Sequence, residues 1–307
     1  MKERKEKTSG MSRCILIGGS GFLGRHVLEE LIREQAEVHV VEHREKIPES
    51  SDYKIIPGGI SSLHTGFLDK LKPDVIFHCA RPTNPSLRWA GRKMAAGIAA
   101  GLNKRLLKSL QRCKLHPKLV FASGSLMYGN HEYPREESDE LNPISFARQY
   151  YKGELPLVNA CRRKEYPIQV LRFPWLLGDG SWFKWFYLEN IDKKQAIPAF
   201  GEGQNMMHFL DVKDAATLMV GYARKAPFPR IHNIFSEQLM KQEEFLDILA
   251  GKFHADIRDY REVFDGGIEK EALEAFTSNI ILRTEYPDIL DQFKFRSLDE
   301  SLENIGQ

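Results

Sequence analysis

The chain has 307 residues, of which 44 are basic and 42 acidic, so its formal net charge is only +2. This length is enough to bury a large core, and the balanced charge excludes a broad electrostatic surface for nucleic acid or anionic lipid. No apolar run approaches the length that spans a bilayer, and the mixed charges of residues 1–7 exclude a signal peptide. We therefore expect a cytoplasmic protein with a disordered tail over residues 1–11 and with no nucleic-acid or membrane partner.

The first predicted element is a strand that enters a glycine-rich turn and then a helix. The apolar run from Cys14 to Ile17 meets a turn carrying Gly18, Gly21 and Gly24, after which apolar residues recur at helical spacing. Glycine lets the backbone turn tightly and approach a pyrophosphate, whose charge meets the free N–H groups of the helix. An ordinary strand-to-helix loop is the alternative, but the flanking strand and helix favour a nucleotide site. The expected cofactor contacts are Gly18, Ser20, Gly21, Phe22, Leu23 and Gly24.

A second strand is predicted over residues 35–41, and Glu42 follows at its end. An acid at this distance from the glycine turn hydrogen-bonds a ribose 2′-hydroxyl and repels a 2′-phosphate, which favours NAD. Arg44 could pair with such a phosphate, so NADP stays possible. Both residues also fit a solvated loop at a strand end.

Strands and helices continue to alternate as far as Pro174. This alternation predicts an α/β fold of the Rossmann type, a doubly wound parallel sheet covered on both faces. Further strands are expected at 54–56, 74–79, 118–122 and 168–173, with helices at 62–71, 92–113 and 145–163.

Beyond Pro174 the elements become shorter and richer in aromatic residues, with helices expected at 212–224 and 242–251. We therefore predict a dinucleotide-binding domain over residues 12–174, with its sheet completed by segments around 204–236. A smaller substrate lobe is expected mainly over 175–307, at the carboxyl edge of the sheet where ligand crevices usually lie.

The four cysteines stand apart in apolar surroundings. Since they show neither Cys-x-x-Cys nor another metal-ligand spacing, we expect reduced thiols and no metal site. The cysteines are Cys14, Cys79, Cys113 and Cys161.

Several motifs, in order along the chain, resemble the extended short-chain dehydrogenases/reductases of the NAD-dependent epimerase/dehydratase family, which includes nucleotide-sugar enzymes. The glycine turn resembles the cofactor loop, residues 73–80 resemble the fourth strand beside the cofactor, and 120–129 the fifth strand with its catalytic-serine loop. Further resemblances lie at 170–174, near the nicotinamide, and at 200–203, 208–214 and 232–236. The resemblance implies a Rossmann fold, with a bound dinucleotide near Cys79, Ala80, Arg81 and Pro174.

The catalytic positions depart from the family. Its reaction uses a serine hydroxyl, a tyrosine, and a lysine four residues after that tyrosine; here these positions fall on Gly124, Phe146 and Tyr150. Phenylalanine has no exchangeable proton and cannot act as an acid or base. Lys152 is two residues off register and points to the other side of the helix.

Other residues are candidates for the missing chemistry. Tyr150 lies one turn beyond Phe146 and, without a neighbouring cation on its face of the helix, would donate rather than accept a proton at neutral pH. Arg81 could face the cofactor phosphates or a substrate anion. Each of these residues could equally have a structural role, as a hydrogen-bonded loop residue or, for Arg81, as a surface arginine. The candidate catalytic residues are Tyr150, Ser123, Ser125 and Tyr128.

The substrate side departs as well. Met207 occupies the place where the nucleotide-sugar enzymes hold the diphosphate with an arginine, and Gly59 the place of an acid that contacts adenine. Trp175 and Trp182 follow the sixth strand, and Trp182, Trp185 and Phe186 share a face at helical spacing. Trp175, Trp182 and Met207 are either lobe core or an apolar wall over the substrate.

Three functional hypotheses remain. The first is an atypical NAD(P)-dependent oxidoreductase acting on a small apolar molecule, in which positioning supports hydride transfer. The second is a non-catalytic NAD(P)-binding sensor or scaffold. The third is a nucleotide-sugar epimerase or dehydratase with relocated catalytic groups. A homodimer that pairs through the helices at 92–113 and 145–163 is the default expectation from the family.

Overall fold

The computed structural model describes residues 12–43, 45–81, 89–303 and 305. The tail expected over residues 1–11 and the NADP-related Arg44 lie outside this described part. Within it, seven parallel strands form a central sheet in the order β10-β6-β5-β4-β1-β2-β3. The strands are β1 (Arg13–Ile17), β2 (Glu37–Glu42), β3 (Tyr53–Pro57), β4 (Val75–His78), β5 (Lys118–Gly124), β6 (Ile168–Phe173) and β10 (Arg230–Asn233).

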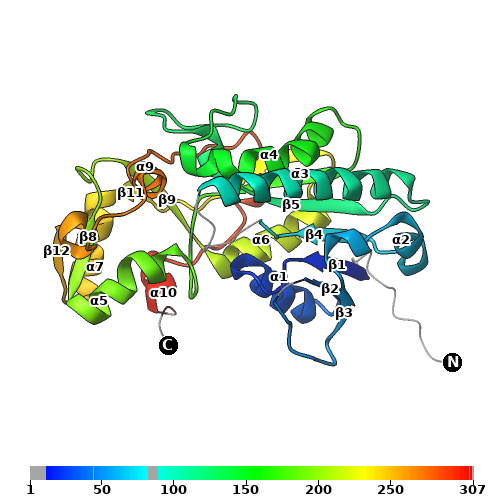
Figure 1. Cartoon of the computed structure of the whole chain (residues 1–307), viewed down its shortest axis with the longest axis horizontal. Helices are drawn as coiled ribbons and strands as arrows, with labels where there is room; N and C mark the ends of the chain where they lie inside the picture. The colour runs from blue at the N-terminus through cyan, green and yellow to red at the C-terminus, as the bar shows by residue number, and fades with distance from the viewer. Residues whose placement is uncertain (1–11, 44, 82–88, 304, 306–307) are drawn as a thin grey trace.

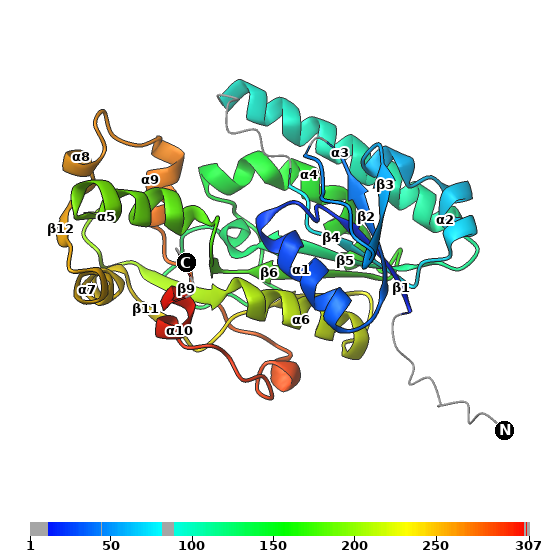
Figure 2. The ribbon, with the colours of Figure 1, turned by 90° about the horizontal axis from the view of Figure 1, so that it is seen from below.

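Two helical layers cover the sheet, as Figures 1 and 2 show. Alternate residues of one strand face opposite layers: Cys14 and Leu16 of β1 pack with the α1–α6 side, whereas Ile15 and Ile17 pack with the α2–α3–α4 side. Every residue of β4 and of β6 is buried, as expected for parallel strands covered on both faces. The helices are α1 (Phe22–Arg33), α2 (Thr65–Leu71), α3 (Trp89–Arg112), α4 (Ser145–Arg162) and α6 (Val212–Lys225).

A smaller lobe lies at the carboxyl ends of the strands (Figure 1). Its sheets have the orders β11-β9-β7 and β12-β8, and its core is rich in aromatic side chains. The strands are β7 (Trp175–Leu177), β8 (Ala196–Ala199), β9 (Met206–Asp211), β11 (Leu239–Lys241) and β12 (Asp256–Asp259). The helices are α5 (Glu189–Lys194), α7 (Gln242–Phe253), α8 (Tyr260–Val263), α9 (Lys270–Phe276) and α10 (Leu298–Glu303). Short helical turns occur in both parts of the molecule: η1 (Ile60–Ser62), η2 (Ser125–Tyr128), η3 (Lys184–Leu188) and η4 (Pro287–Ile289).

The predicted fold class is confirmed, and most elements agree with the pattern to within a few residues. The segment around 204–236 divides between the two parts of the molecule. Its strand β10 completes the main sheet beside β6 and its helix α6 covers that sheet, whereas β9 pairs with β7 and β11 in the lobe. None of the described helices is both long and apolar enough to cross a membrane.

The expected shared face of Trp182, Trp185 and Phe186 is wrong for Trp185. Trp182 and Phe186 pack on the lobe core, whereas Trp185 is 58% exposed. The segment from Lys184 to Leu188 is a π-helical turn, so its residues do not follow α-helical spacing.

Candidate functional site

The loop between β1 and α1 is a close-packed glycine cradle. Gly18 has a φ of +87°, and a Cβ there would lie 2.7 Å from the backbone nitrogen of Ala80. A Cβ at Gly24 would lie 1.9 Å from the Gly18 carbonyl oxygen, and Gly21 N–H donates to that same oxygen over 3.0 Å. Glycine is therefore required at Gly18 and Gly24, so that the backbone of α1 can approach the strand ends.

The N-terminus of α1 has the properties of an anion site. Its N-cap is Gly21, no side chain caps it, and its first turn holds no acid. The first backbone N–H groups of a helix have no intrahelical acceptor, and the positive end of the helix dipole lies there. Ser20 and Gly21 are exposed, Phe22 and Leu23 are half-buried, and the loop can hold a pyrophosphate.

The other expected cofactor residues lie at the carboxyl ends of neighbouring strands. Glu42 ends β2, and its Oε2 accepts a hydrogen bond from the Ile47 N–H over 3.0 Å. Cys79 and Ala80 follow β4, directly beside the glycine cradle, and burial raises the pKa of the Cys79 thiol to about 12. Pro174 is half-buried between β6 and β7.

The positions expected to match the family's serine, tyrosine and lysine lie together beside β5. Phe146 and Tyr150 share one face of α4, with ring centroids 5.6 Å apart. The Arg81 guanidinium carbon lies 5.9 Å from the centre of the Tyr150 ring, and its Nη2 lies 2.9 Å from where a Cβ on Gly124 would stand. Lys152 is exposed, as its register predicts. The centre is therefore a phenol and a guanidinium beside a glycine.

Two of the other candidate hydroxyls already have buried partners. Ser123 Oγ donates to Glu154 Oε2 over 2.6 Å, and both residues are buried. Burial raises the pKa of the Glu154 carboxyl, against the opposing charge of Arg81. Tyr128 is 1% exposed; its hydroxyl donates to Asn233 Oδ1 over 2.7 Å and accepts from Arg172 Nη1 over 2.5 Å. These contacts hold β5, β6 and β10 together.

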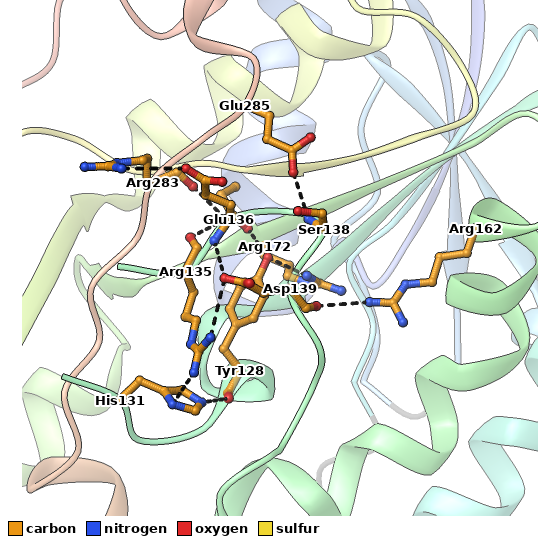
Figure 3. A network of polar contacts seen from close by, with 11 residues as sticks. Tyr128, His131, Arg135, Glu136, Ser138, Asp139, Arg162, Arg172, Arg283 and Glu285 are labelled. Atoms are coloured by element: carbon orange, nitrogen blue, oxygen red, sulfur yellow. Dashed lines mark hydrogen bonds and ion pairs between the residues drawn. The ribbon is translucent and has the colours of Figure 1, made fainter. Parts of the chain in front are cut away.

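The loop after β5 is fixed to a late segment of the chain. Figure 3 shows Tyr128 between Arg172 and His131, whose ring contacts both the Tyr128 carbonyl and Arg135. In the same loop Glu136 forms an ion pair with Arg283, and the Ser138 N–H donates to the Glu285 carboxylate. Ser125 is buried at the start of this loop. Of the four candidate catalytic side chains, only Tyr150 is half-buried rather than buried.

The aromatic residues after β6 form a wall that continues into the lobe core. Trp175 stacks on Phe276 with centroids 5.3 Å apart and meets Trp182 at 4.7 Å. Trp175 also packs with the cluster that holds Phe146 and Tyr150, so it lies between the lobe core and the candidate centre. Met207 is fully buried inside the lobe.

Sequence reasoning missed two partners of this centre. It did not identify Glu154, whose carboxyl accepts a hydrogen bond from the Ser123 hydroxyl. It did not anticipate Phe276, which stacks on both Trp175 and Phe200. The first had a signal, because Glu154 lies on the Tyr150 face of α4 at i,i+4. The second had none, because Phe276 comes from a distant helix.

The comparisons with known proteins show the family and the fold. The model of the NAD dependent epimerase/dehydratase family matches residues 14–234. The chain belongs to this family. Among curated proteins it is 28% identical, over 283 residues, to a UDP-N-acetyl-alpha-D-glucosaminuronate decarboxylase of Bacillus cytotoxicus, with 84% of this chain and 87% of the relative covered.

Solved structures show the same fold. The UDP-glucose 4-epimerase of Thermotoga maritima, solved with UDP-glucose, is similar with a TM-score of 0.76 and 18% identity, covering 95% of this chain and 96% of the epimerase. A dTDP-glucose 4,6-dehydratase of Streptomyces venezuelae, solved with NAD, has a TM-score of 0.74 and 18% identity, covering 94% of each chain.

Proposed function

We propose that this family member is an NAD-dependent enzyme that acts on a nucleotide sugar with relocated catalytic groups. The observation that carries the proposal is the intact glycine cradle beside a reaction centre that keeps a phenol and a cation. The decarboxylase of B. cytotoxicus, similar over most of both chains, supports a nucleotide sugar rather than the small apolar molecule favoured by the sequence alone.

The chain's own residues fit NAD. Gly18, Gly21 and Gly24 would hold the pyrophosphate, and Glu42 would accept the ribose hydroxyl with the oxygen that Ile47 does not use. Bound NAD supplies a hydride acceptor. A Cβ on Gly59, the position where the family has an acid that contacts adenine, would lie 2.8 Å from a ring carbon of His43. At this position an imidazole therefore stands where the family has a carboxylate.

In this proposal Tyr150 replaces the missing phenol one helical turn later. It shares a face with Phe146, and the Arg81 cation lies over its ring. Phe146 and Leu126 contribute apolar surface. In this proposal the Tyr150 phenolate would accept the proton that a sugar hydroxyl loses on oxidation and return it on reduction, while Arg81 over its ring would supply the positive charge that the family takes from lysine.

Two binding experiments and one product assay test the proposal. The purified chain is titrated with NADH and NADPH by energy transfer from its tryptophans, and then with UDP-glucose in saturating NAD. Saturable binding of both ligands and product formation that Tyr150→Phe abolishes are expected. Lys152→Met, on the exposed side of the same helix, is the control and should keep its activity. Binding of NAD without any nucleotide sugar would refute the proposal.

The apolar wall favours a second candidate, an oxidoreductase acting on a small apolar molecule. Leu126, Phe146 and Trp175 lie in one cluster with Tyr150. Turnover of a hydrophobic carbonyl compound with NADH, in the absence of nucleotide-sugar binding, would support it. Cofactor binding without turnover on either substrate class would instead support the non-catalytic sensor or scaffold.

We also propose that α3 contributes to a homodimer. Met94 and Ile98 lie one turn apart on this helix and are 70% and 59% exposed. Gly97 and Gly101 beside them have open space around the Cβ position, so a second helix can approach closely.

A further inference from the structure

We propose that Arg81 and Gly124 form a carboxylate-binding subsite, so that the preferred sugar is an acidic one, a uronate. This inference rests on the proposed nucleotide-sugar function and names its substrate class. In this subsite Arg81 binds the carboxylate of the substrate, and Gly124, which has no side chain, leaves the space in which the guanidinium lies.

The direction of the Arg81 side chain carries the first step. Its backbone follows Ala80, which touches the glycine cradle, but its guanidinium lies against Gly124 and over the Tyr150 ring. The cation therefore turns away from the pyrophosphate position and toward β5 and α4. There it meets the part of the site where the family places its serine, tyrosine and lysine.

The absence of a side chain at Gly124 carries the second step. Gly124 has a φ of −132° and a ψ of 153°, an extended conformation that any residue adopts, so the backbone does not require glycine. A Cβ would come within 2.9 Å of Arg81 Nη2 and 3.8 Å of its Cζ. Glycine here thus makes room for the guanidinium.

The positive charge of Arg81 is not neutralised by an ion pair: Arg81 is exposed, and no ion pair joins it to another of the described residues. The buried Glu154 carboxyl feels the Arg81 charge, which opposes the rise of its pKa on burial, but the two side chains form no ion pair, and Glu154 Oε2 accepts from Ser123. A planar guanidinium at a ligand site matches a carboxylate with two parallel hydrogen bonds.

Binding of two probes that differ at one carbon tests the inference. UDP-glucuronate and UDP-glucose are titrated calorimetrically into the full chain in saturating NAD. Wild type should bind the glucuronate about tenfold or more tightly, as expected for a charge-assisted pair. Arg81→Gln should remove this preference by lowering the affinity for UDP-glucuronate to that for UDP-glucose.

Two further variants separate this role from a general effect. Gly124→Ser should displace the guanidinium, whose end is flexible, and also reduce the preference. Arg105→Gln, an exposed arginine on α3, should leave it intact. Equal affinities in wild type, or a preference that survives Arg81→Gln, would overturn the inference while nucleotide-sugar binding itself stood. A loss of NAD affinity in Arg81→Gln would assign Arg81 to the cofactor instead.

If neither nucleotide sugar binds, the proposed function fails, and the subsite is then tested directly. Saturation-transfer NMR with free glucuronate and glucose compares wild type with Arg81→Gln. Glucuronate contact that depends on Arg81 would uphold the carboxylate subsite, and its absence would overturn the inference.

Discussion

Gly24→Ala should damage both the fold and the cofactor cradle, although alanine is the better helix former. The new Cβ would lie 1.9 Å from the Gly18 oxygen and 2.7 Å from its carbonyl carbon, where ordinary contacts begin at 3.4 Å. Both neighbours are backbone atoms, so the loop must move by about 1.5 Å, the difference between 3.4 and 1.9 Å. Such overpacking costs about 1–3 kcal/mol or more, against about 1 kcal/mol gained in helix propensity.

The effect on NAD should exceed the effect on stability. A loop displaced by this distance loses the hydrogen bonds of its N–H groups to the pyrophosphate. Two such bonds at about 1.5 kcal/mol each correspond to a roughly hundredfold lower affinity.

Urea unfolding and NADH titration measure the two effects side by side. Gly221→Ala in α6 is the matched control, because no atom lies within 4 Å of its Cβ position, and it should unfold at the same or a higher urea concentration. If Gly24→Ala keeps both the wild-type midpoint and the wild-type NADH affinity, the close-packing argument is refuted.

Three other predictions concern the buried histidines, the Glu42 carboxylate and the exposed face of α3. Burial lowers the pKa of His78 to about 4, of His208 to about 4 and of His232 to about 3. In the unfolded chain these histidines become protonated near pH 6.5, whereas in the folded chain they stay neutral until the pH is much lower. Lowering the pH from 6.5 to 4.5 should therefore reduce the free energy of unfolding by about 2–3 kcal/mol for each histidine. An unchanged urea midpoint over this pH range would contradict the prediction. Glu42→Ala should reduce the preference for NADH over NADPH at least about tenfold in paired titrations, and an unchanged ratio would remove Glu42 from cofactor selection. Ile98→Glu should convert a dimer to a monomer in light scattering, and a wild type that is already monomeric at micromolar concentration would refute the α3 interface.

Local patterns predicted the cradle and the sheet well. Gly18, Gly21 and Gly24 could be assigned because their spacing reflects backbone geometry within one strand–turn–helix unit. The buried strands β4 and β6 could be located because both faces of a parallel sheet are covered, which leaves continuous apolar runs.

Side-chain roles were harder to predict than elements. Ser123, near the end of β5, and Tyr128, just after it, were candidates for chemistry, yet their hydroxyls bind Glu154, Arg172 and Asn233 in the interior. Met207 was a candidate wall of the pocket, and it is fully buried in the lobe. Partners from distant segments decide whether a polar or apolar side chain meets solvent.

The sequence by itself determined the glycine loop and the alternating fold, because each depends on residue type at short spacing, and the same spacing predicts that Phe146 and Tyr150 replace the family's tyrosine and lysine. Only the tertiary structure showed that Arg81 lies in the space left by Gly124 and over Tyr150. The physical reason is that these three residues come from different elements. Their contact depends on how β4, β5 and α4 pack, and no local pattern records that arrangement.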